Sequence, residues 1–281
     1  MFVRISSLND RSSHRARVLR YGEEAGVRVD DQLAAEEPLE IRVGGTPLTV
    51  MMRTPGYDRE LALGFLYGEG VIRGATDVAR MAIVPNGEHP DLENVIDVEL
   101  APGAPGVDRR WQRNFLAASS CGLCGVSSIE AIHESAPPLP DDGLLIDRDT
   151  IYGLDARLRA EQAIFARTGG LHAAGLFTVT GEPVVVREDI GRHNAVDKVV
   201  GHAVERRLLP LDRHILMVSG RTSFEIVQKA LQARIPVLVA VSAPSSLARD
   251  LAQASNQTLI GFLRGRSLNV YSCRQRLLNA Q

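Results

Sequence analysis

The sequence is short of lysine, of cysteine and of long apolar runs, and each shortage excludes a class of protein. Only two of its 32 basic residues are lysines, a skew that we attribute to genome composition, and the 34 acidic residues leave a formal net charge of −2. This balance gives no argument for nucleic acid or a membrane surface as a partner. Three cysteines in 281 residues exclude a disulfide scaffold. No apolar run approaches the 18 or so residues of a bilayer span, and the start of the chain lacks the apolar core of a secretory signal, so we expect a cytoplasmic protein.

The first half of the chain predicts a polar arm followed by a small α+β domain. Residues 1–30 are polar and rich in arginine, and we expect them to form a mobile arm. Within residues 31–108, two apolar stretches flank a glycine pair in the pattern of a β-hairpin, and Asp58 stands where a helix cap is expected. Residues 109–140 carry two cysteines and several prolines. We expect them to form a flexible cysteine loop and linker between two folded units.

The second half, residues 141–281, alternates short apolar strands with amphipathic helices. The predicted strands cover residues 176–179, 184–186, 214–218, 237–241, 259–263 and 268–271. Near-continuous apolar strands are typical of a sheet that helices cover on both faces. We therefore predict a largely parallel α/β sheet for this domain.

Four loops follow the predicted strands, over residues 187–194, 219–223, 242–246 and 261–266. In such sheets, ligands bind beyond the carboxyl ends of the strands, where helix N-termini offer free N–H groups to anions. Arg192, Arg221, Arg264 and Arg266 are fork-shaped donors suited to phosphates. Ser and Thr in a single loop are equally explained as ordinary helix caps, but four such loops on one edge favour a phosphorylated ligand. The chain has neither G-x-x-x-x-G-K-[ST] nor G-x-G-x-x-G, which argues against an ordinary ATPase and a Rossmann dehydrogenase.

Two histidines allow more than one interpretation. His193, with Asp197 one helical turn later, has the residue types for general acid–base work, or the two residues form a capping and packing cluster. His172 precedes an apolar strand, and we interpret it as a buried histidine held by hydrogen bonds.

The stretch Cys121-Gly-Leu-Cys124 is the strongest single chemical signal. A zinc site would need about four ligands, with Cys273 and His133 as supplements, and a thioredoxin-like dithiol would need a preceding strand. Zinc deaminase chemistry is excluded, because no H-x-E occurs and Ser120 rather than proline precedes Cys121. The remaining interpretation is an accessible thiolate that carries a group between partners.

At the level of whole motifs, the chain resembles the formate dehydrogenase accessory sulfurtransferases (FdhD). The matching stretches run in order from about residue 38 to the C-terminus: 61–66, 69–70, 120–125, 169–172, 188–198, 219–225, 244–248 and 258–264. The resemblance implies a sulfur relay. A cysteine desulfurase would load the C-x-x-C, and the protein would pass the sulfur to the molybdenum or tungsten bis-pterin guanine dinucleotide cofactor of formate dehydrogenase.

The resemblance also implies a fold and a set of roles. Residues 141–281 would adopt a cytidine-deaminase-like α/β fold without the zinc, and the protein would form a homodimer and hold no permanent metal. Cys121 would carry the persulfide with Cys124 as its helper. The expected cofactor-binding residues are Phe262, Leu263, Arg264, Gly265, Arg266 and Ser267, together with Ser219, Arg221, Arg192 and His193 from the neighbouring loops. The competing hypothesis is a zinc-binding or redox C-x-x-C module without transfer activity.

Overall fold

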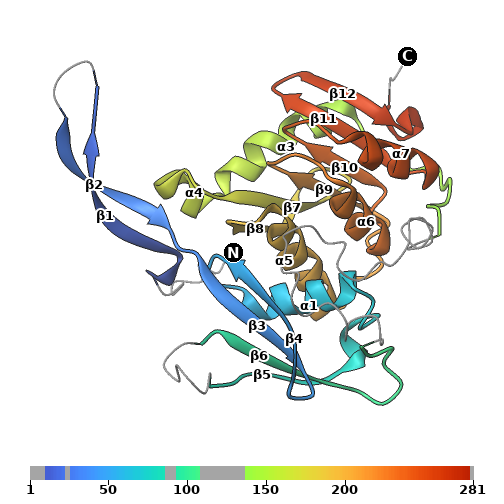
Figure 1. Ribbon diagram of the computed structural model, residues 1–281. Helices are drawn as coiled ribbons and strands as arrows, with labels where there is room; N and C mark the ends of the chain where they lie inside the picture. The colour runs from blue at the N-terminus through green and yellow to red at the C-terminus, as the bar shows by residue number, and fades with distance from the viewer. Residues whose placement is uncertain (1–9, 23–25, 86–92, 108–136, 279–281) are drawn as a thin grey trace, which may run out of the picture.

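The computed structural model describes residues 10–22, 26–85, 93–107 and 137–278, and these residues form three sheets. Figure 1 shows a large α/β body, a smaller unit beneath it and a two-stranded ribbon that projects from their side. The chain is thus a mixed α/β protein, as expected.

The smaller unit is a four-stranded sheet with one helix packed on it. Its strands lie in the order β4-β3-β6-β5, and they are β3 (Glu37–Val43), β4 (Thr46–Arg53), β5 (Val78–Ile83) and β6 (Val95–Leu100). Leu39 and Ile41 of β3 pack against Leu61 and Leu66 of the helix α1 (Asp58–Gly68). The predicted hairpin around the glycine pair is therefore confirmed.

Asp58 does not cap α1, so that prediction is wrong. The cap position is Tyr57, in the left-handed region and without a side-chain cap hydrogen bond. The Asp58 carboxylate instead accepts two hydrogen bonds of 3.0 Å from Arg53, whose side chain is buried. The buried guanidinium needs a counter-charge more than the helix end needs a cap, because a helix end near solvent can bind water.

The ribbon replaces most of the mobile arm that was predicted over residues 1–30. β1 (Ser13–Arg20) pairs antiparallel with β2 (Val27–Ala34), so the prediction is wrong for residues 13–20, and the boundary at residue 30 falls inside β2. Ala16 and Val18 share one face of β1. The strand was not predicted, because arginines surround these two residues in the sequence.

The large sheet has six strands in the order β12-β11-β10-β9-β7-β8. They are β7 (His172–Thr178), β8 (Pro183–Asp189), β9 (His214–Val218), β10 (Val237–Ala240), β11 (Thr258–Arg264) and β12 (Ser267–Ser272). Three adjacent strands, β9, β10 and β11, run parallel to one another, and the other neighbouring pairs of this sheet are antiparallel. The prediction of a largely parallel sheet is therefore wrong. Short turns through Gly181 and Gly265, both at positive φ, join β7 to β8 and β11 to β12, and such turns force an antiparallel pair.

Helices cover both faces of this sheet, as predicted. The helices α5 (Arg192–Glu205), α6 (Phe224–Gln232) and α7 (Ser246–Ala254) bury their apolar sides on one face, and α3 (Arg148–Ala160) buries Ile151, Leu154 and Leu158 on the other. A short helix, α4 (Ala163–Thr168), follows α3. Neither α3 nor α4 was predicted from the sequence, because the few apolar residues of α3 stand among five charged ones.

The two units join where α1 crosses α5 (Figure 1). Glycines allow this crossing. A Cβ on Gly64 would lie 1.8 Å from the carbonyl oxygen of Asp197, and one on Gly201 would lie 1.7 Å from that of Glu60. Each helix therefore has a glycine at the point of contact, because only a residue without a Cβ lets the two backbones touch.

Candidate functional site

The carboxyl edge of the large sheet brings together the four predicted ligand loops. β8 and β9 both run antiparallel to β7, and β9, β10 and β11 are parallel, so β8 to β11 all end at this edge. Backbone hydrogen bonds join the loops: Thr222 N–H donates to Ala243 O at 3.1 Å, and Phe262 N–H to Ser242 O at 3.3 Å. The predicted meeting of the loops at one edge is confirmed.

Two helices that begin at this edge leave their N-termini without a side-chain cap. Gly191 precedes α5 and Ser223 precedes α6, and neither makes a cap hydrogen bond, whereas Ser245 caps α7 by accepting from Ala248 N–H. The first N–H groups of α5 therefore keep their capacity for an acceptor, whereas in α6 the Glu225 carboxylate already accepts from its own N–H. The helix dipole makes an anion the favoured one.

The hydroxyl of Ser223 is engaged by His193 and Glu225 instead. The His193 Nε2 atom lies 2.9 Å from Ser223 Oγ and 3.2 Å from Glu225 Oε2, and Ser223 Oγ donates to Glu225 at 2.6 Å. Burial alone would raise the pKa of Glu225, but the hydrogen bonds from His193 and Ser223 outweigh it and hold this pKa at about 2. Glu225 fixes the His193 ring. The sequence did not predict this role, because His193 and Glu225 stand on different helices.

Asp197 takes no part in that cluster. Its carboxylate accepts a 2.6 Å hydrogen bond from Lys229, and both side chains are buried under α1. The pairing of His193 with Asp197, considered from their spacing, is therefore not the one that the structure shows. Packing accounts for Asp197, while His193 stays at the edge of the sheet.

Cationic side chains cluster around the start of β7. Burial lowers the pKa of His172, and the nearby charges of Arg192, His193 and Arg221 lower it further. The interpretation of His172 as a buried, hydrogen-bonded residue is wrong: its ring is only partly buried, it lines a cavity, and no described residue forms a hydrogen bond with it. An anion at this place would relieve the mutual repulsion of these four residues.

Two buried donors at this edge have no partner among the described residues. They are Arg192 Nε and the hydroxyl of Thr222, a residue only 1% exposed. An unsatisfied buried polar group is costly and rare in folded proteins. Both stand at the helix ends that lack side-chain caps, and a group with acceptor oxygens at this place would satisfy them.

A cavity of about 350 Å³ opens at the start of β7. His172 and Ser219 line it from the sheet, and Asp155, Gln162 and Phe165 line it from α3 and the start of α4. This volume lies within the range of small-molecule sites. The wall provided by α3 was not foreseen, because α3 itself was missed.

The predicted cofactor segment, residues 262–267, comprises the end of β11, the turn through Gly265 and the first residue of β12. Phe262 and Arg264 are exposed, Gly265 turns the chain at positive φ and Ser267 begins β12, whereas Leu263 is fully buried in the core. Arg266 donates to Asp149 at 2.6 Å, and its guanidinium lies 5.0 Å from the centre of the Tyr152 ring. Of the two arginines in this segment, Arg264 is therefore the one whose guanidinium forms no hydrogen bond or ion pair with a described residue. Leu263 packs in the core.

Other residues of the 188–198 stretch build the interior. Asp189 forms a 2.7 Å ion pair with Lys198, and both side chains are buried. The Asp189 carboxylate also accepts hydrogen bonds from Thr54 N–H and from the Asn194 side chain. Glu188 accepts from the N–H groups of Ile164 and Phe165 at the start of α4. These side chains hold the loop in place.

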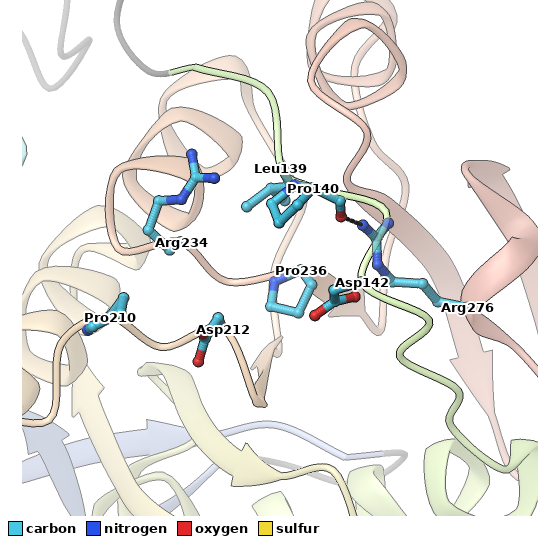
Figure 2. A pocket seen from close by; sticks show the side chains of 8 residues that line it. All are labelled: Leu139, Pro140, Asp142, Pro210, Asp212, Arg234, Pro236 and Arg276. Atoms are coloured by element: carbon cyan, nitrogen blue, oxygen red, sulfur yellow. Dashed lines mark hydrogen bonds between the residues drawn. The ribbon is translucent and has the colours of Figure 1, made fainter.

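A second cavity, of about 210 Å³, lies at the opposite edge of the sheet (Figure 2). Leu139 and three prolines line it, together with Asp142, Asp212, Arg234 and Arg276. The two guanidiniums donate to backbone carbonyls: Arg276 to Pro140 and Asn256, and Arg234 to Pro137 and Pro138. Both are therefore used in holding residues 137–140, which distinguishes this cavity from the first.

Cys121 and Cys124 lie outside the described residues, as does His133. Cys273 is described and partly buried, and burial raises the pKa of its thiol. Within residues 10–22, 26–85, 93–107 and 137–278, no group of three His, Cys, Asp or Glu side chains is arranged to hold a metal. Nor does any helix in these ranges have the length and apolar character to cross a membrane.

Comparison with known proteins gives consistent matches over nearly the whole chain. Residues 34–278 match the model of the FdhD/NarQ family. The sulfur carrier protein FdhD of Streptomyces avermitilis is 50% identical over 271 residues, covering 95% of this chain and 96% of that protein. The FdhD of Mycobacterium tuberculosis is 53% identical over 253 residues, or 88% and 92% of the two chains. The crystal structure of a formate dehydrogenase accessory protein from Desulfotalea psychrophila shares the fold with a TM-score of 0.77 at 24% identity, over 95% of this chain and all of that one.

Proposed function

Because the chain belongs to the FdhD/NarQ family, we propose that it is a sulfur carrier that serves formate dehydrogenase. Relatives that are half identical over nearly their full length carry the name sulfur carrier protein FdhD. The C-x-x-C of residues 121–124 supplies the thiols that such a role needs. For the second domain, a deaminase-like fold that has lost its zinc agrees with the missing H-x-E.

In the proposed relay, Cys121 is the residue that carries sulfur. Its thiolate attacks the outer sulfur of a cysteine desulfurase persulfide, which leaves the desulfurase as a thiolate and Cys121 as a persulfide. Cys124 then attacks the inner sulfur, so that a Cys121–Cys124 disulfide forms and the outer sulfur departs with the bonding electrons as hydrosulfide. A cellular thiol must reduce the disulfide before the next cycle.

The acceptor in this proposal is the molybdenum or tungsten bis-pterin guanine dinucleotide cofactor, bound as cargo at the carboxyl edge. The observation that supports it is a pair of buried donors, Arg192 Nε and Thr222 Oγ1, which have no partner among the described residues and lie at the starts of two helices without a side-chain cap. A diphosphate has the charge and acceptor oxygens that these groups lack. His172, His193, Ser219 and Arg221 surround the same place, and Arg264 adds an exposed guanidinium from the β11–β12 turn.

Calorimetry with GDP tests this assignment, because GDP has the guanine and diphosphate of the proposed cargo. A charge-assisted guanidinium–phosphate contact contributes about 1.5–3 kcal/mol. Arg264→Ala should therefore weaken GDP binding by about ten-fold or more. Arg234→Ala, at the opposite edge, is the matched control and should leave the affinity unchanged. Equal affinities for wild type and Arg264→Ala would contradict the role of Arg264.

Mass spectrometry after incubation with a desulfurase and cysteine tests the relay. Wild-type protein should gain one sulfur, Cys121→Ala should gain none and should fail to activate formate dehydrogenase, and Cys124→Ala should load but turn over poorly. Sulfur on Cys124 of an active Cys121→Ala variant would contradict the choice of Cys121. Stoichiometric zinc on the purified protein, lost on mutation of the cysteines, would favour the metal or redox module instead.

The partners in this proposal are a cysteine desulfurase as donor, formate dehydrogenase as recipient and a second copy of the chain in a homodimer. A cytoplasmic location fits a relay that ends before the cofactor is inserted. Neither nucleic acid nor a membrane has a part in it.

A further inference from the structure

The β1–β2 ribbon is a sheet that is incomplete by itself. It has two strands, and no third described strand pairs with either outer edge. Figure 1 shows the ribbon extending well away from the body of the protein. An isolated two-stranded hairpin is marginally stable in water, and three or more strands with an apolar face are needed for independent stability.

One face of the ribbon carries apolar side chains that are open to solvent. The pairing of Val18 with Val29 places these two side chains on the same face. Ala16, Val27 and Leu33 share it by the two-residue alternation of strands, together with the polar His14, Arg20 and Asp31. Val27 is 62% exposed and Leu33 is 51% exposed, so the described chain leaves this face largely uncovered.

The two edges of the ribbon differ in charge. β1 carries Arg15, Arg17 and Arg20 and no carboxylate. β2 carries Arg28 and Asp30 on the same face, two residues apart, with Val29 between them on the other face. An edge with charges of one sign repels a copy of itself, whereas an edge with both signs at the right spacing attracts one.

The spacing in β2 fits a two-fold axis through Val29. When two copies of β2 run antiparallel about that axis, Arg28 of each copy lies opposite Asp30 of the other, and the two Val29 residues face each other. Axes through Arg28, Asp30 or Asp31 would instead place like charges together. The charges of β2 therefore select one register.

We propose that two copies of this chain pair along β2, antiparallel and centred on Val29, to form the four-stranded sheet β1-β2-β2-β1. Across its centre, one face holds the valine row Val18, Val29, Val29 and Val18. On the other face, each Asp30 lies between its own Arg17, at 3.5 Å in the single chain, and Arg28 of the second copy. The outer edges are then both β1, whose arginines oppose further strand addition, so the assembly closes as a dimer.

This inference rests on the homodimer included in the proposed function and adds the surface where the copies meet. Sulfur loading and nucleotide binding do not enter it. Its failure is therefore separable from that of the sulfur-carrier role.

Sedimentation velocity on the full chain tests the pairing by charge reversal. Arg28→Asp places a new carboxylate opposite Asp30 of the other copy twice, without disturbing an ion pair inside the ribbon, because Arg28 faces Leu19 in its own chain. The double change Arg17→Asp with Asp30→Arg keeps the internal pair inverted and places a new guanidinium opposite each Arg28. Each variant should raise the dimer dissociation constant by about 10- to 100-fold, since two pairs are lost and two repulsions gained.

Combining all three changes inverts the whole charge row and should restore dimerisation to within a few-fold of wild type. Arg15→Asp, an equal charge change on the unused edge, is the matched control and should have little effect. The proposal is overturned if the wild-type chain is monomeric at tens of micromolar, if the dimer is insensitive to Arg28→Asp, or if the triple change does not recover it. Circular dichroism of each variant checks that the body is folded, which the exposed position of the ribbon favours.

Discussion

Charged side chains are buried in pairs at the junction of α1 with α5, whereas two arginines at the carboxyl edge of the large sheet lack counter-charges among the described residues. At the junction, Lys198 pairs with Asp189 and Lys229 with Asp197. At the edge, Arg192 and Arg221 form no ion pair with any described residue, and the buried hydroxyl of Thr222 has no partner among them. The stretch 188–198 contributes to both regions, so neighbouring residues of one motif have different duties.

The difference separates structural charge from functional charge. A buried ion pair with its hydrogen bonds satisfied needs nothing further, and removing either partner leaves a costly charge. Donors left unsatisfied at helix ends raise the free energy of the empty protein, and a ligand can recover that energy on binding. If this division is right, mutations at the junction should act on stability and mutations at the edge on ligand affinity.

The largest effect is expected from Gly201→Ala. The new Cβ would overlap the backbone carbonyl of Glu60 at 1.7 Å, and two helix backbones cannot move apart without opening the core between the units. We expect a loss of about 5 kcal/mol or more in the free energy of unfolding, measured by urea denaturation. Gly153→Ala in α3 is the matched control, because the nearest atom there is 3.9 Å from the new Cβ. It should stabilise the protein by about 0.5–1 kcal/mol, and a similar small effect for Gly201→Ala would refute the close crossing.

Asp189→Asn should cost about 3–5 kcal/mol, because it leaves the buried Lys198 ammonium without its carboxylate. Glu205→Gln removes the partner of Arg59 in an exposed pair and should change stability by at most about 0.5–1 kcal/mol. Urea denaturation of both variants at pH 7 makes the comparison. Equal effects of the two changes would mean that burial does not distinguish these pairs.

The sequence predicted the parts of this molecule that depend on local patterns. The strand predicted over residues 214–218 is β9, His214–Val218, because a buried strand bounded by loops is visible in five apolar-rich residues. The meeting of the four loops followed from strand order alone. In contrast, α3 was missed because most of its residues face solvent.

The paired charges of the junction could not be predicted, because each pair joins elements far apart in the chain. Nothing near Asp197 in sequence indicates Lys229, and nothing near His193 indicates Glu225. The glycines at 64 and 201 are likewise understandable only once α1 lies on α5. The β1–β2 ribbon could not be predicted from composition, because a strand that is exposed on both faces and rich in arginine has the composition of a polar tail.

Thr222→Val tests the carboxyl edge directly. It removes the unpartnered hydroxyl and keeps the volume, so the free energy of unfolding should stay equal or rise by up to about 1 kcal/mol. GDP affinity should fall by about ten-fold, the loss of one hydrogen bond to a charged group. Calorimetry and urea denaturation on the same samples separate the two quantities. Reduced stability with unchanged affinity would place Thr222 with the structural residues and blur the contrast between the two regions.

Glu69 differs from the paired charges of the junction. It follows α1 at the junction, close to Lys229 and Asp197, yet no described residue donates a hydrogen bond to its carboxylate. Burial raises the pKa of Glu69 to about 6, and the attraction of Lys229 offsets this only in part. The folded state thus prefers the protonated acid, so the stability associated with Glu69 is fully present below pH 4.5 and is lost as the pH rises through 6.

Glu69→Gln should therefore have almost no effect on the free energy of unfolding at about pH 4, where the acid is largely protonated in both states. At about pH 8 the amide avoids the cost of a buried carboxylate, and the variant should be more stable than wild type by about 1–2 kcal/mol. Urea denaturation at several pH values gives the difference curve, and Glu205→Gln, at an exposed site, should give a flat one. A variant that is less stable at the higher pH than at the lower, relative to wild type, would show that Glu69 is held ionised by Lys229. The junction would then contain only satisfied charges, and its contrast with the open edge of the sheet would be complete.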